Sequence, residues 1–168
     1  MTTEELAPEA RTLVLRGTVE AIHIAPAADA PMVPVERVRA IAGVGLEGDR
    51  YATRTGTWIE DPKVDRDITL IEAEVIEDLA ATDGIALAPG ETRRNVTTRG
   101  IRLNELVGRR FRVGAVLCEG TRLCEPCQHL TDTLGKPILR PLVHRAGLRA
   151  HIVEGGQIAV GAEVVALD

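Results

Sequence analysis

Short stretches in which apolar and polar residues alternate recur along the chain, and this pattern restricts its fold more than any other feature. The clearest of them are residues 12–24 and 111–117. A period of two places every second side chain on the same face of a strand. Residues 33–41, 148–153 and 157–167 are equally rich in aliphatic side chains, and the last stretch reads as two short strands around a turn. The sequence therefore predicts a fold built mainly from short strands.

A few helices interrupt these strands. Residues 72–81 are rich in Glu and Ala and end at an Asp-Gly pair, which predicts a helix, and residues 103–107 fit one helical turn. A further helical segment, broken by one glycine and two prolines, extends from the cysteines to His144. Residues 67–70 read as a short strand, and residues 92–98 read as a polar strand or an extended loop. Many short strands with few inserted helices favour an α+β, predominantly β fold with a β-barrel-like core.

The core has to be built from aliphatic side chains, because the chain has one Trp, one Tyr and one Phe although 45% of its residues are hydrophobic. A length of 168 residues suits one domain with one core. We therefore expect a flexible amino-terminal lead over residues 1–11 and a single domain over residues 12–168. Residues 53–63 read as a polar loop.

The charge balance excludes several classes of partner. The net charge is −5, which argues against non-specific nucleic-acid binding, and the scarcity of aromatic residues removes a platform for stacking bases. No stretch approaches the length of a membrane helix, and the first residues lack the pattern of a signal peptide. We therefore expect a cytoplasmic protein that binds neither nucleic acid nor membrane.

The chemistry of the chain is concentrated at Cys124 and Cys127, two thiols separated by two residues. Pro126 favours the start of a helix, which would place Cys127 in the first helical turn. Unpaired N–H groups and the helix dipole favour a thiolate there, and Arg122 and a protonated His129 act in the same direction. A thiolate is a soft metal ligand or a sulfur nucleophile.

Four interpretations of this cysteine pair are open. A zinc site would need two more ligands, and no second pair with metal-ligand spacing is present, although four residues are available: Cys118, His129, His144 and His151. A thioredoxin-like redox pair would follow an early strand, whereas this motif lies late in the chain. A single working thiolate, Cys127, and a buried structural pair are the other two. Cys118 lies in an aliphatic run and is best explained as a core residue.

Three further motifs carry charged residues that suit an anion. Residues 43–48 match Gly-x-Gly-x-x-Gly, but no helix follows, so we interpret them as a turn that presents Asp49 and Arg50. Residues 93–97 place two arginines and an asparagine in one extended segment, which could cradle a phosphate or carboxylate. Residues 144–149 add another basic cluster.

In their order along the chain, these motifs resemble the MOSC domain, named for the carboxy-terminal domain of molybdenum cofactor sulfurases. The resemblance extends from about residue 15 to residue 165. It is carried by five pieces besides the cysteine motif: Gly48-Asp49-Arg50-Tyr51, Arg94-Asn95 before Gly100-Ile101, the segment 106–114, the segment 144–149, and Gly161.

This resemblance implies a β-barrel and a functional cysteine that binds molybdenum or carries sulfur. Cys127 matches that cysteine best, and Cys124 is the alternative. Characterised members bind molybdopterin, reduce N-hydroxylated compounds with electrons from a partner protein, and usually carry an additional amino-terminal domain. This chain is similar to the small stand-alone bacterial form. The pyridoxal phosphate often associated with the family has no support here, because neither Lys63 nor Lys136 lies in a matching motif.

We therefore predict a molybdenum-cofactor-binding protein, an oxidoreductase or a component of one, with Cys127 as the metal ligand. The residues expected to contact the cofactor are Asp49, Arg50, Arg93, Arg94, Asn95, Thr97, His144, Arg145 and Arg149. The alternative is a sulfur carrier without redox turnover, in which Cys127 receives a persulfide from a sulfur-donor protein.

Overall fold

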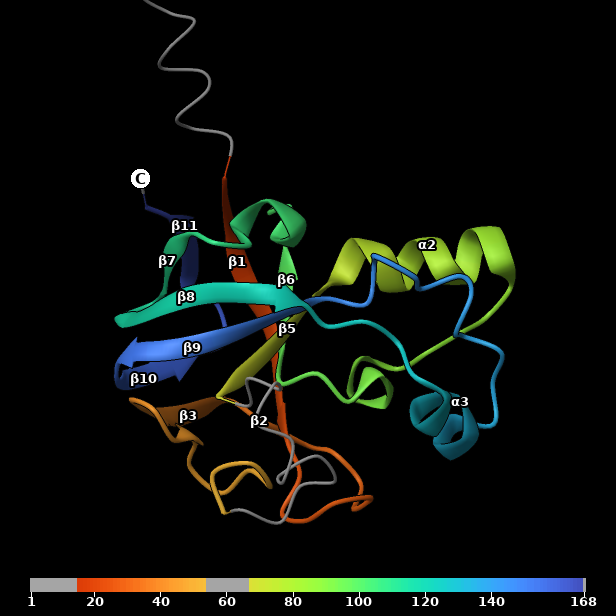
Figure 1. Ribbon diagram of the computed structural model, residues 1–168, viewed down its shortest axis with the longest axis horizontal. Helices are drawn as coiled ribbons and strands as arrows, with labels where there is room; N and C mark the ends of the chain where they lie inside the picture. The colour runs from red at the N-terminus through yellow and green to blue at the C-terminus, as the bar shows by residue number, and fades with distance from the viewer. Residues whose placement is uncertain (1–14, 54–66, 168) are drawn as a thin grey trace, which may run out of the picture.

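The computed structural model describes residues 15–53 and 67–167, which form a β-barrel with a helical lobe on one side (Figure 1). The strands are β1 (Arg16–Ile24), β2 (Val33–Val35), β3 (Arg37–Ile41), β4 (Gly45–Leu46), β5 (Ile68–Glu72), β6 (Val96–Arg99), β7 (Arg110–Val113), β8 (Val116–Leu123), β9 (Leu148–Glu154), β10 (Gly156–Ala159) and β11 (Glu163–Ala166). The helices are α2 (Ala73–Asp83) and α3 (Gln128–Leu134), and two 3₁₀ turns are η1 (Pro89–Thr92) and η2 (Leu103–Leu106).

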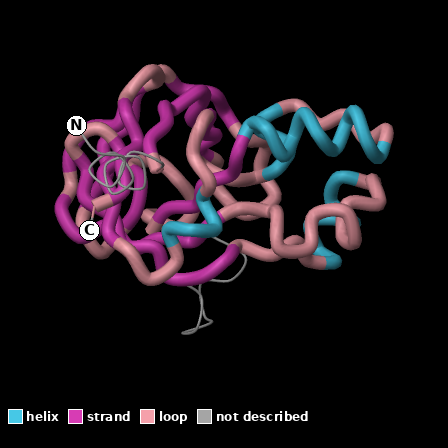
Figure 2. Tube along the Cα trace, turned by 90° about the horizontal axis from the view of Figure 1, so that it is seen from above, coloured by secondary structure: helices cyan, strands magenta, loops and turns pink. Residues whose placement is uncertain are grey.

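The barrel closes because its first and last strands pair with each other. Around the ring the order is β11, β7, β8, β9, β5, β6 and β1, and β1 then pairs with β11. The β5–β6 pair is parallel and the other pairs of the ring are antiparallel. Strand β2 extends the sheet beside β1, while β3, β4 and β10 form a smaller sheet. Figure 2 shows the strands surrounding the barrel interior, with both helices to one side.

Strand β5 separates two hydrophobic cores. Leu70 points into the barrel, whose core contains mainly Val, Ile and Leu side chains, and Ile71 points outward into a second core under the lobe. Helix α2 covers that outer face with Ile76 and Leu79, three positions apart and therefore on one side of the helix. Residues 68–71 of β5 are therefore buried on both faces of the strand, including the polar Thr69 on the outer face.

The predominantly β, barrel-like fold predicted from the sequence is confirmed, and so are several of its elements. The predicted helix over 72–81 is α2, which ends where Gly84 adopts a left-handed conformation and its N–H donates to Leu79 O. The helical turn predicted over 103–107 is η2, and the two carboxy-terminal strands are β10 and β11. The predicted lead over residues 1–11 and all but Thr53 of the predicted 53–63 loop lie outside the described residues.

Three predicted boundaries are wrong. Residues 111–117 are divided between β7 and β8, because a turn at Gly114 reverses the chain and Val113 pairs with Val116. Residues 33–41 are divided at Glu36: β2 pairs with β1, whereas β3 pairs with β10 and β4. The helical segment ends at Leu134, since Gly135 is left-handed and two prolines follow, and turns extend from there towards His144. No helix among the described residues is long and apolar enough to cross a membrane.

Candidate functional site

Five residues from neighbouring segments form a row across the outer face of the barrel. Arg122 of β8 lies opposite Arg149 of β9, which lies opposite Thr69 of β5. Asn95, just before β6, accepts hydrogen bonds from Thr69 N and Oγ1 at 3.1 Å, and its carbonyl accepts from His23 N of β1 at 2.7 Å. The residues next to them in β5, β9 and β1 belong to the barrel core, so this row faces outward. The row begins beside residues 124–127, which join β8 to α3 and which we call the cysteine loop.

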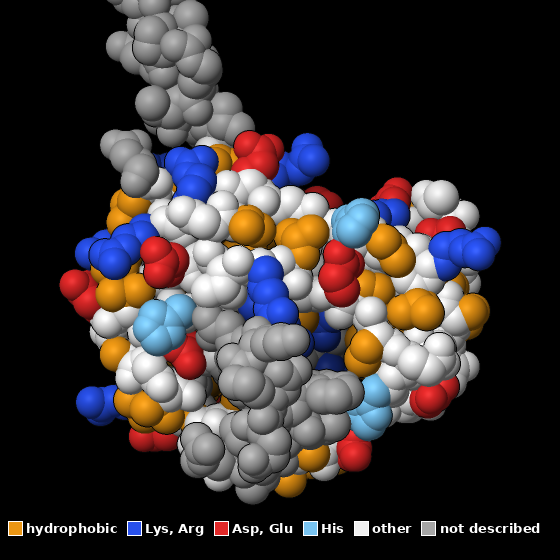
Figure 3. Space-filling model, viewed as in Figure 1, with side chains coloured by type: hydrophobic (Ala, Val, Ile, Leu, Met, Phe, Trp, Pro, Cys, Tyr) orange, Lys and Arg blue, Asp and Glu red, His pale blue; other side chains and the backbone are white. Residues whose placement is uncertain are grey.

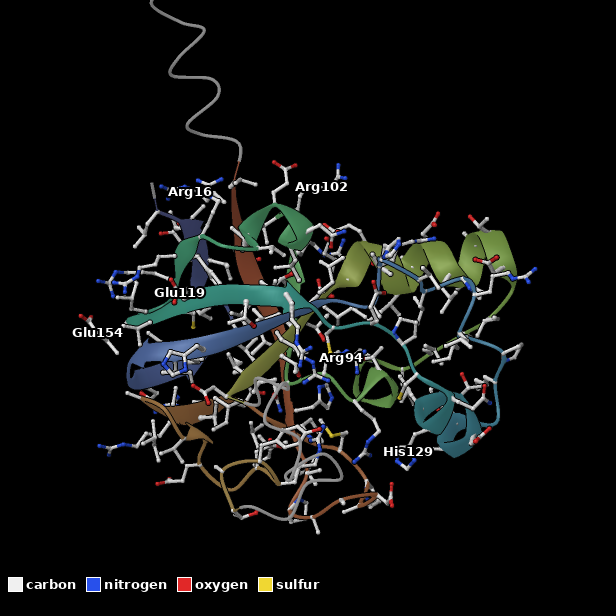
Figure 4. The ribbon with its side chains drawn as sticks, viewed as in Figure 1. Arg16, Arg94, Arg102, Glu119, His129 and Glu154 are labelled. Carbon is white, nitrogen blue, oxygen red and sulfur yellow. The ribbon has the colours of Figure 1, made fainter. Side chains whose placement is uncertain are left out.

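Arg94 connects this row to the cysteine loop. Its side chain is buried, and its guanidinium donates to Ala146 O at 2.8 Å, to Cys124 O at 3.0 Å, and to Thr92 O and Glu125 O at 3.3 and 3.4 Å. Figure 4 shows Arg94 at the junction between the barrel and the segment that leads to α3. Arg94 makes no ion pair with an acidic residue in the described part of the chain, so it fixes the loop and leaves a positive charge beside it.

A second basic group lies at the other end of the row. Arg50 is 5% exposed and donates to Asp49 Oδ1 and to Arg93 O, both at 3.1 Å, and its guanidinium carbon lies 4.5 Å from the centre of the Tyr51 ring. Arg93, which is left-handed, donates to Ala30 O at 2.8 Å. Burial lowers the pKa of Arg93, and the charge of Arg50 lowers that pKa further. Arg50 and Arg93 therefore form a pair of like charges, which we call the arginine pair.

Some of the expected cofactor residues are occupied by structural contacts. Asp49 Oδ1 accepts from Ala25 N at 3.0 Å in addition to Arg50, and the Asn95 amide donates to His23 O at 3.2 Å. Thr97 is fully buried beside the lobe, and its hydroxyl has no hydrogen-bond partner among the described residues. Asp49, Asn95 and Thr97 therefore belong to the buried support of the site and present little surface to a ligand.

The three cysteines have different environments. Cys118 is in the barrel core, as the sequence predicts, and Cys124 is 1% exposed, while Cys127 is half-buried. Cys127 is the residue that precedes α3 and has an extended backbone, so its predicted place in the first helical turn is wrong by one position. The helix begins only at Gln128, and the proline therefore lies two residues before it. Cys127 is consequently the one thiol, among the three, that a ligand can reach.

His144 and Arg145 do not join the arginine pair. The backbone N–H of His144 donates to Glu125 Oε1 at 2.7 Å and its ring Nδ1 contacts the other carboxylate oxygen, while Arg145 pairs with Asp78 of α2. The chain then passes through Gly147, whose φ is +116° and where a Cβ would lie 2.0 Å from Leu70 O, so only glycine fits against β5. His144 thus supports the cysteine loop from the side of the lobe.

Sequence reasoning missed Thr69 and His23. Both belong to stretches read as plain strands, and a polar residue on an outward position of a strand normally faces solvent. Only the pairing of β5 and β1 with Asn95 brings them into the row, and no local pattern signals that pairing. On the face shown in Figure 3, Lys and Arg side chains gather at the centre, some of them in a hollow between the barrel and the lobe.

The residues present fit a molybdenum cofactor better than a bare metal ion or pyridoxal phosphate. No three His, Cys, Asp or Glu side chains gather closely enough to hold a metal ion in the described residues. A molybdopterin brings its own sulfur ligands and an anionic group, and so requires from the protein one accessible thiol and surrounding cations. Of the two lysines, Lys136 donates to Ala86 O at 2.9 Å and lies near Glu91, outside this row, and Lys63 lies outside the described residues.

The half-buried carboxyl of Glu72, beside His144 and Arg145, should make the stability of the protein depend on pH. It lines a cavity of about 350 Å³ with His144 and Arg145, and burial raises the pKa of its carboxyl, opposed by a hydrogen bond from Leu103 N. A raised pKa in the folded state means that the stability Glu72 contributes is complete at low pH and is lost as pH rises through that pKa.

We therefore expect Glu72→Gln, which stays neutral, to be more stable than the wild type at pH 7 by up to about 1 kcal/mol. The difference should shrink towards pH 4, where the wild-type carboxyl is protonated. Urea unfolding of both proteins across this range measures it. A difference that grows as pH falls would contradict the assignment.

Comparison with known proteins agrees with the architecture. A family model described as MOSC domain matches residues 21–165. The fold is similar to the YuaD protein from Bacillus subtilis, with a TM-score of 0.74 and 17% identity over 89% of this chain and 94% of that one. It is also similar to YiiM from Geobacillus stearothermophilus, with a TM-score of 0.69 and 16% identity over 90% and 75% of the two chains. A third similar structure is YiiM from Escherichia coli, with a TM-score of 0.66 and 18% identity over 92% of this chain and 70% of that one. No curated protein matches the sequence.

Proposed function

The chain belongs to the MOSC domain family, and from this premise we propose that it binds a molybdenum cofactor through Cys127 and reduces N-hydroxylated compounds. The observation that carries the proposal is the state of Cys127. It is the only half-buried thiol of the three, and it follows directly on the loop whose carbonyls Arg94 holds. A thiol that has to ligate a metal needs both access and a fixed backbone.

The arginine pair supports the binding of an anionic group. The charge of Arg50, which also pairs with Asp49 at 3.1 Å, lowers the pKa of Arg93, and both side chains are at least partly buried. Two like charges held together by the fold are stabilised when an anion binds between them, and guanidinium groups bind phosphate oxygens in pairs. Arg149, opposite Arg122 in the row, adds a cross-strand pair of like charges at the other end.

Each residue then has a distinct task in the proposed reaction. Cys127 supplies a soft sulfur ligand, the arginines orient the anionic part of the cofactor, and Arg94 keeps the cysteine loop in one position. The bound cofactor supplies the two-electron chemistry. Conversion of N–OH to N–H releases water and consumes two electrons and two protons, so a separate reductant, which we take to be a partner protein, has to deliver the electrons.

Metal analysis tests this proposal directly. The protein is purified from a strain that makes the cofactor, and molybdenum and pterin are measured in the folded protein. We expect both to copurify. A folded protein that contains neither would overturn the proposal.

The second candidate is a sulfur carrier that has no redox turnover, and the same accessible thiol favours it. In this reaction the Cys127 thiolate attacks the outer sulfur of a donor protein's persulfide, the sulfur–sulfur bond breaks, and the donor leaves as a thiolate. Cys118 and Cys124 are too buried to take part without local opening.

Mass spectrometry after incubation with a cysteine desulfurase and cysteine distinguishes this candidate. A carrier should gain roughly 32 Da on Cys127, the mass of one sulfur atom, and lose it on reduction. Cys127→Ser is the control that should remain unlabelled. Absence of the adduct, or an adduct on Cys118, would exclude the carrier function.

A further inference from the structure

The cavity beside Glu72 has charged walls of both signs. It lies between the start of α2, the η2 turn and the turn that precedes Gly147, and its volume is about 350 Å³. The residues that line it among those described are Glu72, Glu74, Val75, Arg102, Asn104, His144 and Arg145. Ligand pockets in proteins measure about 300–1,000 Å³, so this cavity suits a small molecule.

The two carboxylates of the cavity each have one oxygen engaged. Glu72 Oε2 accepts from Leu103 N at 3.0 Å, and Glu74 Oε2 accepts from Gly100 N at 2.7 Å. The second oxygen of each carboxylate makes no hydrogen bond within the described residues. Burial raises the pKa of Glu72, and the charge of Glu74 raises it further, so the two carboxyls lie close together. The cavity therefore contains negative charge that these residues do not neutralise by hydrogen bonding.

Two guanidinium groups belong to the same cavity. Arg102, labelled in Figure 4, immediately precedes η2 and makes no side-chain hydrogen bond with any residue that the structure describes. Arg145 uses one nitrogen for Asp78 of α2. Both arginines are near enough to lower the pKa of Glu72, although neither forms an ion pair with it within the described ranges. Opposite charges are thus held around one space without meeting each other.

This arrangement is costly for the fold alone. A carboxylate that is half-buried without an ion-pair partner destabilises a protein, which is why Glu72→Gln is expected above to be the more stable protein at pH 7. Ionisable groups that lower stability and lie in a cavity are candidates for a functional site. Cys127 does not line this cavity, so its ligand is distinct from a molecule that reacts at the thiol.

We propose that this cavity binds a small, neutral α-amino acid in its zwitterionic form, a role that goes beyond the proposed function. The carboxylate of the ligand accepts from Arg102 and Arg145, because guanidinium groups bind carboxylates through paired N–H donors. Its ammonium group has three donors for the acidic side, formed by Glu72 and Glu74. A ligand with only one of the two charges leaves one side of the cavity unpaired.

The lining also limits the side chain of the amino acid. Val75 is the one apolar side chain of the seven that line the cavity among the described residues, so little apolar surface is present for a large hydrophobic group. A further charge on the ligand would repel one of the two sets of charges that already face it. Alanine satisfies both conditions and serves as the probe.

The test is a titration at pH 7 of the full-length, ¹⁵N-labelled protein from the cofactor-producing strain, followed by NMR. The probes are L-alanine, L-alaninamide, which lacks the carboxylate, and N-acetyl-L-alanine, which lacks the ammonium group. We expect L-alanine to bind saturably and to shift the amide signals of residues 74–75 and 102–104. Each derivative should bind at least about 10-fold more weakly, because it leaves charged groups of the cavity unpaired. Equal affinity for the three probes, no binding of L-alanine, or shifts confined to other residues would overturn the proposal.

Two variants separate binding from folding. Arg102→Met and Glu72→Gln should each weaken L-alanine about 10-fold, although the first keeps its stability and the second gains some. Arg140→Met is the matched control, because Arg140 is exposed in the turns after α3 and does not line the cavity, so its affinity should equal that of the wild type. Wild-type affinity in both cavity variants, or the same loss in Arg140→Met, would contradict the site.

Discussion

Cys127→Ser is expected to lose all bound molybdenum and all reductase activity while its fold stays intact. A serine hydroxyl has nearly the same size as the thiol, but it is a much poorer ligand for a soft metal. Cys127 is half-buried and its backbone carbonyl, which accepts from Thr131 N at 3.1 Å, is unaffected by the change. Circular dichroism and metal analysis of the same preparation measure the two parts of this prediction.

Cys124→Ser is the matched control. Cys124 contributes backbone contacts, since its N–H donates to Gly147 O at 2.8 Å and its carbonyl accepts from Arg94. These contacts survive the substitution, so we expect a loss of metal affinity or activity of about 10- to 100-fold, not a complete one. Complete loss in both variants would instead favour a dithiol mechanism, and an unfolded Cys127→Ser would favour a structural metal site.

Arg94→Met is expected to cost the most stability among the site variants. Methionine fills much of the arginine's volume and donates nothing, so the carbonyls of Thr92, Cys124, Glu125 and Ala146 lose a buried donor. We expect a loss of about 3 kcal/mol in the free energy of unfolding, which lowers the Tm of a domain of this size by roughly 10 °C. Cofactor retention should fall as well, because the cysteine loop loses its anchor.

Arg102→Met is the control that separates the loss of the Arg94 hydrogen bonds from the loss of a positive charge. Arg102 is exposed in Figure 4 and makes no side-chain hydrogen bond within the described ranges, so its substitution should change stability by less than about 0.5 kcal/mol. Arg94→Lys should fall between the two, because one ammonium cannot serve carbonyls in several directions. An Arg94→Met protein as stable as Arg102→Met would show that the four contacts carry little energy. Thermal unfolding of the three variants measures all of this.

Local sequence predicts well those elements whose ends are marked by a particular residue type or by a change of pattern. Helix α2 ends at a glycine, and the strands carry their alternation wherever one face meets the barrel core. The errors lie where the pattern continues through a change of direction. The apolar residues at 111, 113, 115 and 117 continue through the Gly114 turn, although that turn shifts the inward positions from Phe111 and Val113 to Val116 and Cys118. A pattern of period two cannot register such a reversal.

For the site, the sequence by itself determined which residues are candidates for chemistry: one cysteine pair and several arginines in a MOSC-like order. It could not determine which of them face a ligand. Asn95 and Arg94 read alike as anion-binding residues, yet both are taken up by backbone and strand contacts. The row that joins Arg122 to His23 exists only because β8, β9, β5, β6 and β1 pair in that order. Strand pairing between distant segments depends on closure of the barrel, and so only the tertiary structure decided it.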